Sequence, residues 1–77
     1  MKIDCTKYYE TLNKSKHYLE KDNANNIEQT ISELGCYSGV PLLAIIVFYM
    51  NTYGETPSLN KFKDRMIKFY GYTEVIE

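Results

Sequence analysis

The longest apolar run in the chain, Val40 to Met50, predicts a buried helix at the centre of the fold. Its hydrophobic side chains cover nearly the whole circumference of a helix, which is typical of a helix surrounded by protein on most sides. Pro41 suits the first turn, because the amide hydrogen it lacks would have had no partner there, and Gly54 can end the helix. A buried strand is the rival interpretation, but the run is long for a strand and no second segment of matching character is available to pair with it. We therefore expect a central helix over about residues 41–53.

Two amphipathic segments before this run predict two further helices. From Asp4 to about Lys21, apolar residues return at spacings of three, four and seven, which places them on one stripe of a helix. These residues are Cys5, Tyr8, Leu12 and Leu19. Asn26 and Gln29 have the spacing of a capping box, so we expect a short second helix that begins there and ends at Gly35.

One amphipathic segment after the run predicts the last helix. Thr56 and Pro57 supply a cap and a first-turn proline, and Gly71 supplies the residue that ends the helix. The apolar stripe between them consists of Leu59, Phe62, Met66, Phe69 and Tyr70. Residues 72–77 follow as a short tail that either adds a turn or packs as an extended arm. The sequence thus predicts an all-α fold, a small four-helix bundle around the central hydrophobic helix of about residues 41–53.

Composition places the chain among small globular proteins and restricts where it can act. Its 77 residues make one domain, 1–77, whose hydrophobic content of 44% and charged content of 25% are average for such proteins. The apolar run of 11 residues is too short for a membrane span, which needs roughly 20. The N-terminus has no apolar signal segment, so we expect a cytoplasmic protein, outside the membrane, whose thiols at Cys5 and Cys36 stay free.

The residues that carry catalysis or hold metals are too few and too scattered to indicate an enzyme. Metal ligation has only Cys5, His17 and Cys36 to draw on, and His17 falls on the helix face opposite Cys5. That separation also argues against a cysteine–histidine nucleophile pair, because thiol and imidazole must lie within hydrogen-bond reach. The glycines occur singly and do not form a phosphate-binding loop. We therefore expect no catalytic site, no cofactor and no metal.

Tyrosine is the most unusual feature of the composition, with eight in 77 residues and no tryptophan. Part of this set falls at stripe edges, loops or helix ends, where a ring can be buried while its hydroxyl stays in water. These residues are Tyr9, Tyr18, Tyr37, Tyr53 and Tyr72. Such tyrosines are typical of protein interfaces, although a small helical domain also uses them to cover the edges of its core. We assign them as candidate protein-binding residues.

Charge is distributed unevenly along the chain, and this supports an alternative function. No lysine or arginine occurs between Asp22 and Asn60, whereas the last predicted helix carries several beside one acid, Asp64. These cations are Lys61, Lys63, Arg65 and Lys68. Lys61, Arg65 and Lys68 share a helix face that can contact the phosphates of a nucleic acid. The other interpretation is an ordinary solvated face, and a net charge of −1 gives the whole molecule no attraction for phosphate.

The preferred hypothesis is a non-enzymatic protein-binding module, a small regulator or inhibitor that occupies the surface of a partner protein. Incomplete covering of the central helix by its short neighbours would favour a homodimer. The small size and the Lys, Asn, Ile and Tyr content resemble those of phage or mobile-element accessory proteins, such as anti-CRISPR or other anti-host factors. The alternative hypothesis is a nucleic-acid-binding regulator that uses the basic face of the last helix.

Overall fold

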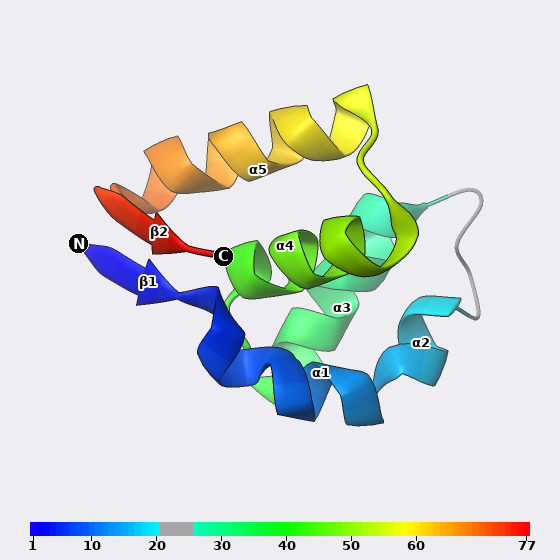
Figure 1. Cartoon of the computed structure of the whole chain (residues 1–77). Coiled ribbons are helices and arrows are strands. Elements are labelled where there is room, and N and C mark those ends of the chain that lie inside the picture. The colour runs from blue at the N-terminus through cyan, green and yellow to red at the C-terminus, as the bar shows by residue number, and fades with distance from the viewer. Residues whose placement is uncertain (21–25) are drawn as a thin grey trace.

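Helices make up most of the computed structural model, which describes residues 1–20 and 26–77 (Figure 1). The helices are α1 (Tyr9–Lys14), α2 (Lys16–Glu20), α3 (Ile27–Ser38), α4 (Leu42–Tyr53) and α5 (Pro57–Tyr70), and a 3-10 turn, η1 (Cys5–Tyr8), precedes α1. The strands β1 (Lys2–Asp4) and β2 (Glu74–Ile76) pair with each other. A mostly helical fold is thus confirmed, whereas the predicted all-α four-helix bundle is not, because the described chain has more helical segments and a small sheet.

The predicted central helix is confirmed as α4, which lies between α5 on one side and α1 and α3 on the other (Figure 1). Its side chains from Leu43 to Phe48 are buried, and Ile45 and Ile46 are fully enclosed. A helix of this kind is stabilised by packing, because it has no polar face to offer to water. Within the described residues, no helix, α4 included, has the length and apolarity that a membrane span needs.

The first predicted helix, residues 4–21, is wrong as a continuous element. The chain instead runs through β1, η1, α1 and α2, and a turn at Ser15 divides α1 from α2. The predicted stripe is nevertheless buried, since Cys5, Leu12 and Leu19 are fully enclosed. α1 packs against α4 whereas α2 packs against α3, so the change of direction at Ser15 lets Leu12 and Leu19 reach different helices. The predicted end of this helix lies outside the described residues.

The second predicted helix is longer than expected, because Gly35 does not end it. α3 continues to Ser38, and Gly39 ends the helix with a left-handed φ of 72°. Gly35 lies inside α3 against Leu42, where an added Cβ atom would come within 2.7 Å of the Leu42 Cδ2 atom. The missing side chain therefore permits the close approach of α3 to the start of α4. The predicted capping box is also wrong, since the Asn26 side chain forms no cap hydrogen bond.

The last predicted helix is confirmed as α5, together with both of its ends. The Thr56 hydroxyl accepts a hydrogen bond from the Leu59 amide at 3.2 Å, and Gly71 ends the helix with a φ of 70°. The predicted apolar stripe is wrong only in the last turn, where Phe69 is 76% exposed and Tyr70 is 43% exposed. Phe69 falls at the margin of the stripe, and in this turn the neighbouring elements no longer enclose the stripe.

A two-stranded parallel sheet joins the two ends of the chain, and the sequence pattern did not predict it. The register pairs Lys2 with Glu74, Ile3 with Val75 and Asp4 with Ile76. Strands of three residues are too short to show an alternation of apolar and polar positions. Of the two interpretations of residues 72–77, the extended arm is confirmed and the added helical turn is wrong.

Candidate functional site

The predicted binding tyrosines do not form one surface, because the fold distributes them over separate places. Tyr9, Tyr18 and Tyr53 each place the hydroxyl against a polar partner within the molecule. Tyr37 and Tyr72 form no side-chain hydrogen bond with the described residues. The hydroxyls of the first group therefore hold elements of the fold together, whereas in the second group Tyr37 is exposed and Tyr72 is half-buried.

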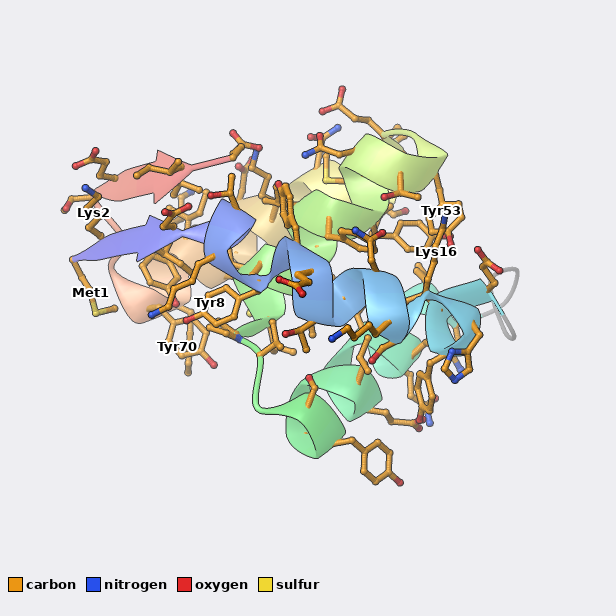
Figure 2. The ribbon with its side chains drawn as sticks, turned by 60° about the horizontal axis from the view of Figure 1, so that its bottom comes forward. Met1, Lys2, Tyr8, Lys16, Tyr53 and Tyr70 are labelled. Carbon is orange, nitrogen blue, oxygen red and sulfur yellow. The ribbon has the colours of Figure 1, made fainter. Side chains whose placement is uncertain are left out.

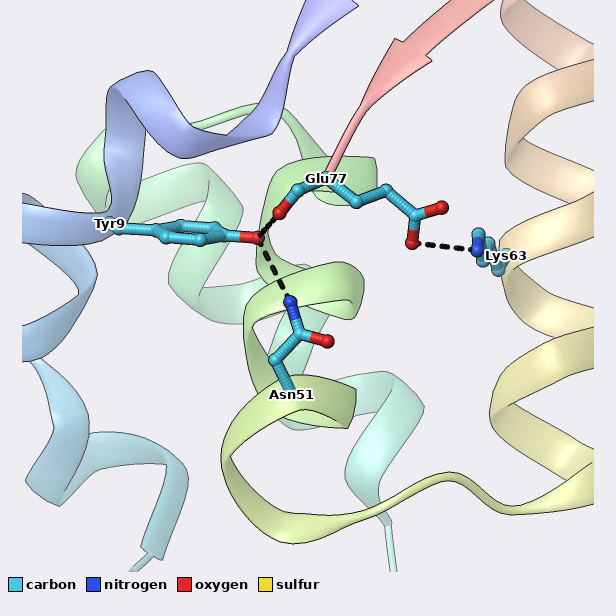
Figure 3. A network of polar contacts seen from close by, with 4 residues as sticks. All are labelled: Tyr9, Asn51, Lys63 and Glu77. Atoms are coloured by element: carbon cyan, nitrogen blue, oxygen red, sulfur yellow. Dashed lines mark hydrogen bonds and ion pairs between the residues drawn. The ribbon is translucent and has the colours of Figure 1, made fainter.

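Tyr9 lies in a polar network that joins α1, α4 and α5 to the residue after β2 (Figure 3). Its hydroxyl donates a hydrogen bond to the Glu77 carbonyl oxygen at 2.6 Å and accepts one from Asn51 Nδ2 at 3.1 Å. The Glu77 carboxylate pairs with Lys63 Nζ at 2.9 Å, and the Lys63 side chain is only 18% exposed. The Tyr9 ring packs on Phe48, and burial raises the pKa of Tyr9. These contacts hold β2 against the helical part of the fold.

Tyr18 and Tyr53 connect α2 to its neighbours in a similar way. Tyr18 donates a hydrogen bond to the Glu33 carboxylate at 3.2 Å and so joins α2 to α3. Tyr53 donates one to Glu20 at 2.7 Å and so joins the end of α4 to α2, while its ring packs on Tyr49. Loss of solvent and the hydrogen bond to Glu20 raise the pKa of Tyr53 to about 12. Both hydroxyls are already engaged inside the molecule.

Tyr37 is the most exposed of the predicted tyrosines, with 79% of its surface open to solvent. It lies in the last part of α3, and its ring meets that of Tyr18 edge-on at an angle of 69°, with centroids 6.1 Å apart. The two rings border a shallow hollow of about 240 Å³. The other residues that line it are Ser15, His17, Leu34 and Ser38. Tyr37 therefore stays a candidate contact residue.

A group of aromatic side chains lies in the last turn of α5 and just after it. We call Phe69, Tyr70 and Tyr72 the C-terminal aromatic cluster. The Phe69 and Tyr70 rings are perpendicular with centroids 4.9 Å apart, and the Tyr70 and Tyr72 centroids are 5.7 Å apart. Phe69 and Tyr70 are exposed, whereas Tyr72 is half-buried. Figure 2 shows Tyr70 at the same end of the molecule as Tyr8 and the start of β1.

A groove opens beside this cluster and has Tyr70 as one of its walls. Its volume is about 320 Å³, and none of its lining residues is charged. The other lining residues are Ser32, Gly35, Cys36, Val40, Pro41 and Leu42. They come from α3, from the start of α4 and from the loop between the two helices, so the groove lies where Gly35 brings these helices together. Exposed rings beside an uncharged groove are typical of the centre of a protein-binding surface.

The sequence pattern did not identify Phe69 and Tyr70 as surface residues, because helical periodicity cannot separate them from the core. Both continue the spacing of Leu59 and Phe62, which are buried. The one available signal was their position in the last turn before Gly71, where the chain leaves the packed part of the helix. Of the predicted tyrosines, Tyr72 is the member that the structure brings into this cluster.

Of the four predicted nucleic-acid-binding cations, three are exposed on α5 and the fourth is largely buried. Lys61, Arg65 and Lys68 are exposed, whereas Lys63 points toward the end of β2 and belongs to the network in Figure 3. Arg65 pairs with Glu28 of α3 at 2.8 Å, so its charge is balanced locally. Lys61 and Lys68 form no ion pair with the described residues. An open hollow of about 510 Å³ adjoins this helix, lined by Glu28, Ser58, Lys61, Asp64 and Arg65.

The side chains considered for metal binding or nucleophilic chemistry differ in their surroundings. Cys5 is fully enclosed, and burial raises the pKa of its thiol to about 11, which keeps the thiol protonated at neutral pH. Cys36 and His17 are exposed. Within residues 1–20 and 26–77, no group of three or more histidine, cysteine or acidic side chains is arranged to hold a metal ion.

Comparison of the chain with models of protein families, with curated proteins and with solved structures finds no match. Function is therefore inferred below from the residues and their geometry.

Proposed function

We propose that this protein is a non-enzymatic protein-binding module, and that its partner contacts the C-terminal aromatic cluster and the groove beside it. The observation that supports the proposal is the 76% exposure of Phe69, a side chain without a polar group to offer to water. Large aromatic side chains dominate the binding energy of protein interfaces. In this proposal the protein is a cytoplasmic regulator or inhibitor that acts by covering a surface of its partner.

The cluster is also suited to binding because its rings are held in place before a partner arrives. Phe69 and Tyr70 lie in a regular helix that Gly71 ends, and each ring rests against the next at 4.9 and 5.7 Å. A surface that is already ordered loses little conformational entropy on association. The adjoining groove of about 320 Å³ can receive a side chain from the partner, because its uncharged walls impose no charge to be matched.

Size and composition support a specific origin for such a module. The small size and the Lys, Asn, Ile and Tyr content support a phage or mobile-element accessory protein of the anti-CRISPR or other anti-host type. A protein of this kind needs only a surface that fits its target. The exposed cluster is a surface of that type.

A nucleic-acid-binding regulator is the second candidate function, and one observation favours it. Lys68 is exposed directly before Phe69 and Tyr70, and exposed rings beside cations can stack on the bases of single-stranded nucleic acid. It is less well supported because Lys63 and Arg65 already have acidic partners in the molecule. Fluorescence anisotropy with single-stranded and duplex DNA over a salt series tests it. A steep salt dependence that is lost in Lys61→Glu with Lys68→Glu would favour this function over protein binding.

Site-specific photo-crosslinking tests the protein-binding proposal. A photoreactive phenylalanine analogue placed at Phe69 should capture a partner from a cell extract, and mass spectrometry should identify it. The matched control carries the analogue at Lys14, whose side chain is 79% exposed but lies on α1. The purified partner should then bind Phe69→Ala about 100-fold more weakly than the unchanged protein, as at an interface hot spot. Equal capture from both positions, or equal affinity of the variant, would contradict the proposal.

A further inference from the structure

We propose that the partner of the C-terminal aromatic cluster is a second copy of this chain, and that the two copies exchange the segment after Gly71. In the exchanged dimer, β2 of each copy pairs with β1 of the other. This inference rests on the proposed function, since it assigns a specific partner to the same surface. In this dimer each copy supplies the Glu77 that completes the Tyr9 network of the other copy.

The contacts that hold β2 in place can all be formed with a second copy. β2 pairs with β1, the Tyr9 hydroxyl donates to the Glu77 carbonyl oxygen, and Lys63 pairs with the Glu77 carboxylate. The Thr73 amide also donates to the Met1 carbonyl oxygen at 2.7 Å. Each contact joins residues 73–77 to a segment that precedes Gly71. Exchange between two copies therefore breaks none of these contacts permanently.

β2 has few enclosed side chains to oppose its opening. Each strand of the parallel pair has three residues, and an isolated two-stranded sheet has little stability of its own. Val75 and Ile76 are only half-buried, in contrast to the fully enclosed side chains of α4. Elements with few enclosed side chains open locally at low cost in free energy.

The link between α5 and β2 has the properties of a hinge. Only residues 71–73 separate the two elements, and Gly71 holds a left-handed φ of 70°. A short link favours domain exchange, because the strand that follows it can reach a second copy when the link is extended. In an exchanged dimer the two links pass each other near the two-fold axis. Phe69, Tyr70 and Tyr72 flank this link, so their rings would meet their counterparts there.

The exposed area of the cluster is too small for a stable contact between two faces alone. An aromatic side chain buries about 150–250 Å² at most, so the exposed parts of Phe69 and Tyr70 amount to roughly 250 Å². A stable protein interface buries about 800 Å² on each partner. The cluster alone falls well short of that value. The contacts of residues 73–77 with the other copy only replace equal contacts within one copy, so the exchanged dimer should form only at high protein concentration.

A cysteine pair placed across the two strands distinguishes exchange from other modes of association. Lys2 and Glu74 lie opposite each other in the register, and neighbouring strands are close enough for a disulfide. We would introduce Lys2→Cys and Glu74→Cys together with Cys36→Ser, which removes the exposed native thiol. After oxidation at millimolar concentration and denaturation, exchange predicts a covalent dimer on a non-reducing gel. A covalent monomer from a sample that light scattering shows to be dimeric would overturn the inference.

The hinge residue provides a second test with a closely matched control. Gly71→Ala forces a Cβ onto a left-handed backbone without meeting any neighbour, and so does Gly39→Ala at a φ of 72°. Both variants should lose similar stability as monomers. Only Gly71→Ala should strengthen dimerisation, by about tenfold in Kd, because exchange extends this link and relieves the strain.

The outcomes separate this inference from the proposed function. A protein that is monomeric at millimolar concentration by light scattering, or equal dimer Kd values for both glycine variants, would overturn exchange. In the crosslinking experiment, the photoreactive analogue at Phe69 could instead capture a different protein from the cell extract. That result would support the protein-binding proposal and show that the partner is not a second copy.

Discussion

Two sets of aromatic residues in this small fold differ in what their side chains contact. Tyr9, Tyr18 and Tyr53 direct their hydroxyls to acceptors on other elements. Phe69 and Tyr70 are exposed and contact each other, and the Tyr70 ring also contacts that of Tyr72. The first set acts as cross-links between short helices, and the second set presents apolar surface. Tyrosine content alone therefore does not locate a binding surface, since the position of an acceptor decides the role of each ring.

Removal of Phe69 should have the largest effect and should act on association alone. Phe69→Ala is expected to weaken dimerisation about 100-fold, because an exposed ring at the centre of an interface acts as a hot spot. The same change should leave the free energy of unfolding of the monomer within about 0.5 kcal/mol, as for other surface substitutions. Sedimentation equilibrium gives the Kd and urea unfolding gives the stability. A large loss of stability with unchanged Kd would show that Phe69 belongs to the core.

Removal of a hydrogen-bonded hydroxyl should show the opposite behaviour. Tyr9→Phe leaves Asn51 and the Glu77 carbonyl oxygen without their partner, so unfolding should become easier by about 1.5 kcal/mol. Tyr70→Phe is the matched control, because the Tyr70 hydroxyl has no hydrogen bond with the described residues. Urea unfolding of the three proteins measures the difference. Equal stability of both variants would show that the Tyr9 hydroxyl stabilises the fold no more than the Tyr70 hydroxyl does.

Alkaline pH should lower the stability of the folded protein through the buried thiol of Cys5. Burial raises the pKa of this thiol from 9.0 to about 11 in the folded protein. Between these values the unfolded chain has lost a proton that the folded chain retains, so stability falls as the pH rises above 9. At pH 10 the loss should be about 1 kcal/mol relative to Cys5→Ala, which has no thiol to titrate. Urea unfolding from pH 7 to 10 measures it, and parallel pH profiles would contradict the assigned burial.

The smallest effect is expected outside both sets of rings. Lys14 and Glu10 form an ion pair at 3.9 Å whose side chains are 79% and 88% exposed. Lys14→Ala should change neither the free energy of dimerisation nor the free energy of unfolding by more than about 0.5 kcal/mol, because solvent screens such pairs. Thermal unfolding and sedimentation equilibrium provide this baseline. A larger change in Kd would show that the binding surface includes α1.

The sequence predicts the structure best where one residue or a short run of residues decides the local conformation. The enclosed run of α4, the Thr56 cap and the turn at Gly71 each follow from the chemistry of the residues themselves. The break at Ser15 and the pairing of Lys2 with Glu74 depend on contacts between segments far apart in the chain, and no local pattern encodes them. The exposure of Phe69 was missed for the same reason, since its neighbours in space decide whether an apolar side chain is enclosed.

The contact between Gly35 and Leu42 has a consequence for the binding groove. Both residues line the groove, and an added Cβ atom at position 35 would lie 2.7 Å from Leu42. A single methyl group there would force α3 and α4 apart or displace the leucine, and the recess beside Tyr70 would change shape without any change in its polarity. The absence of one side chain thus sets the size of the groove and so selects which groups from another molecule can enter it.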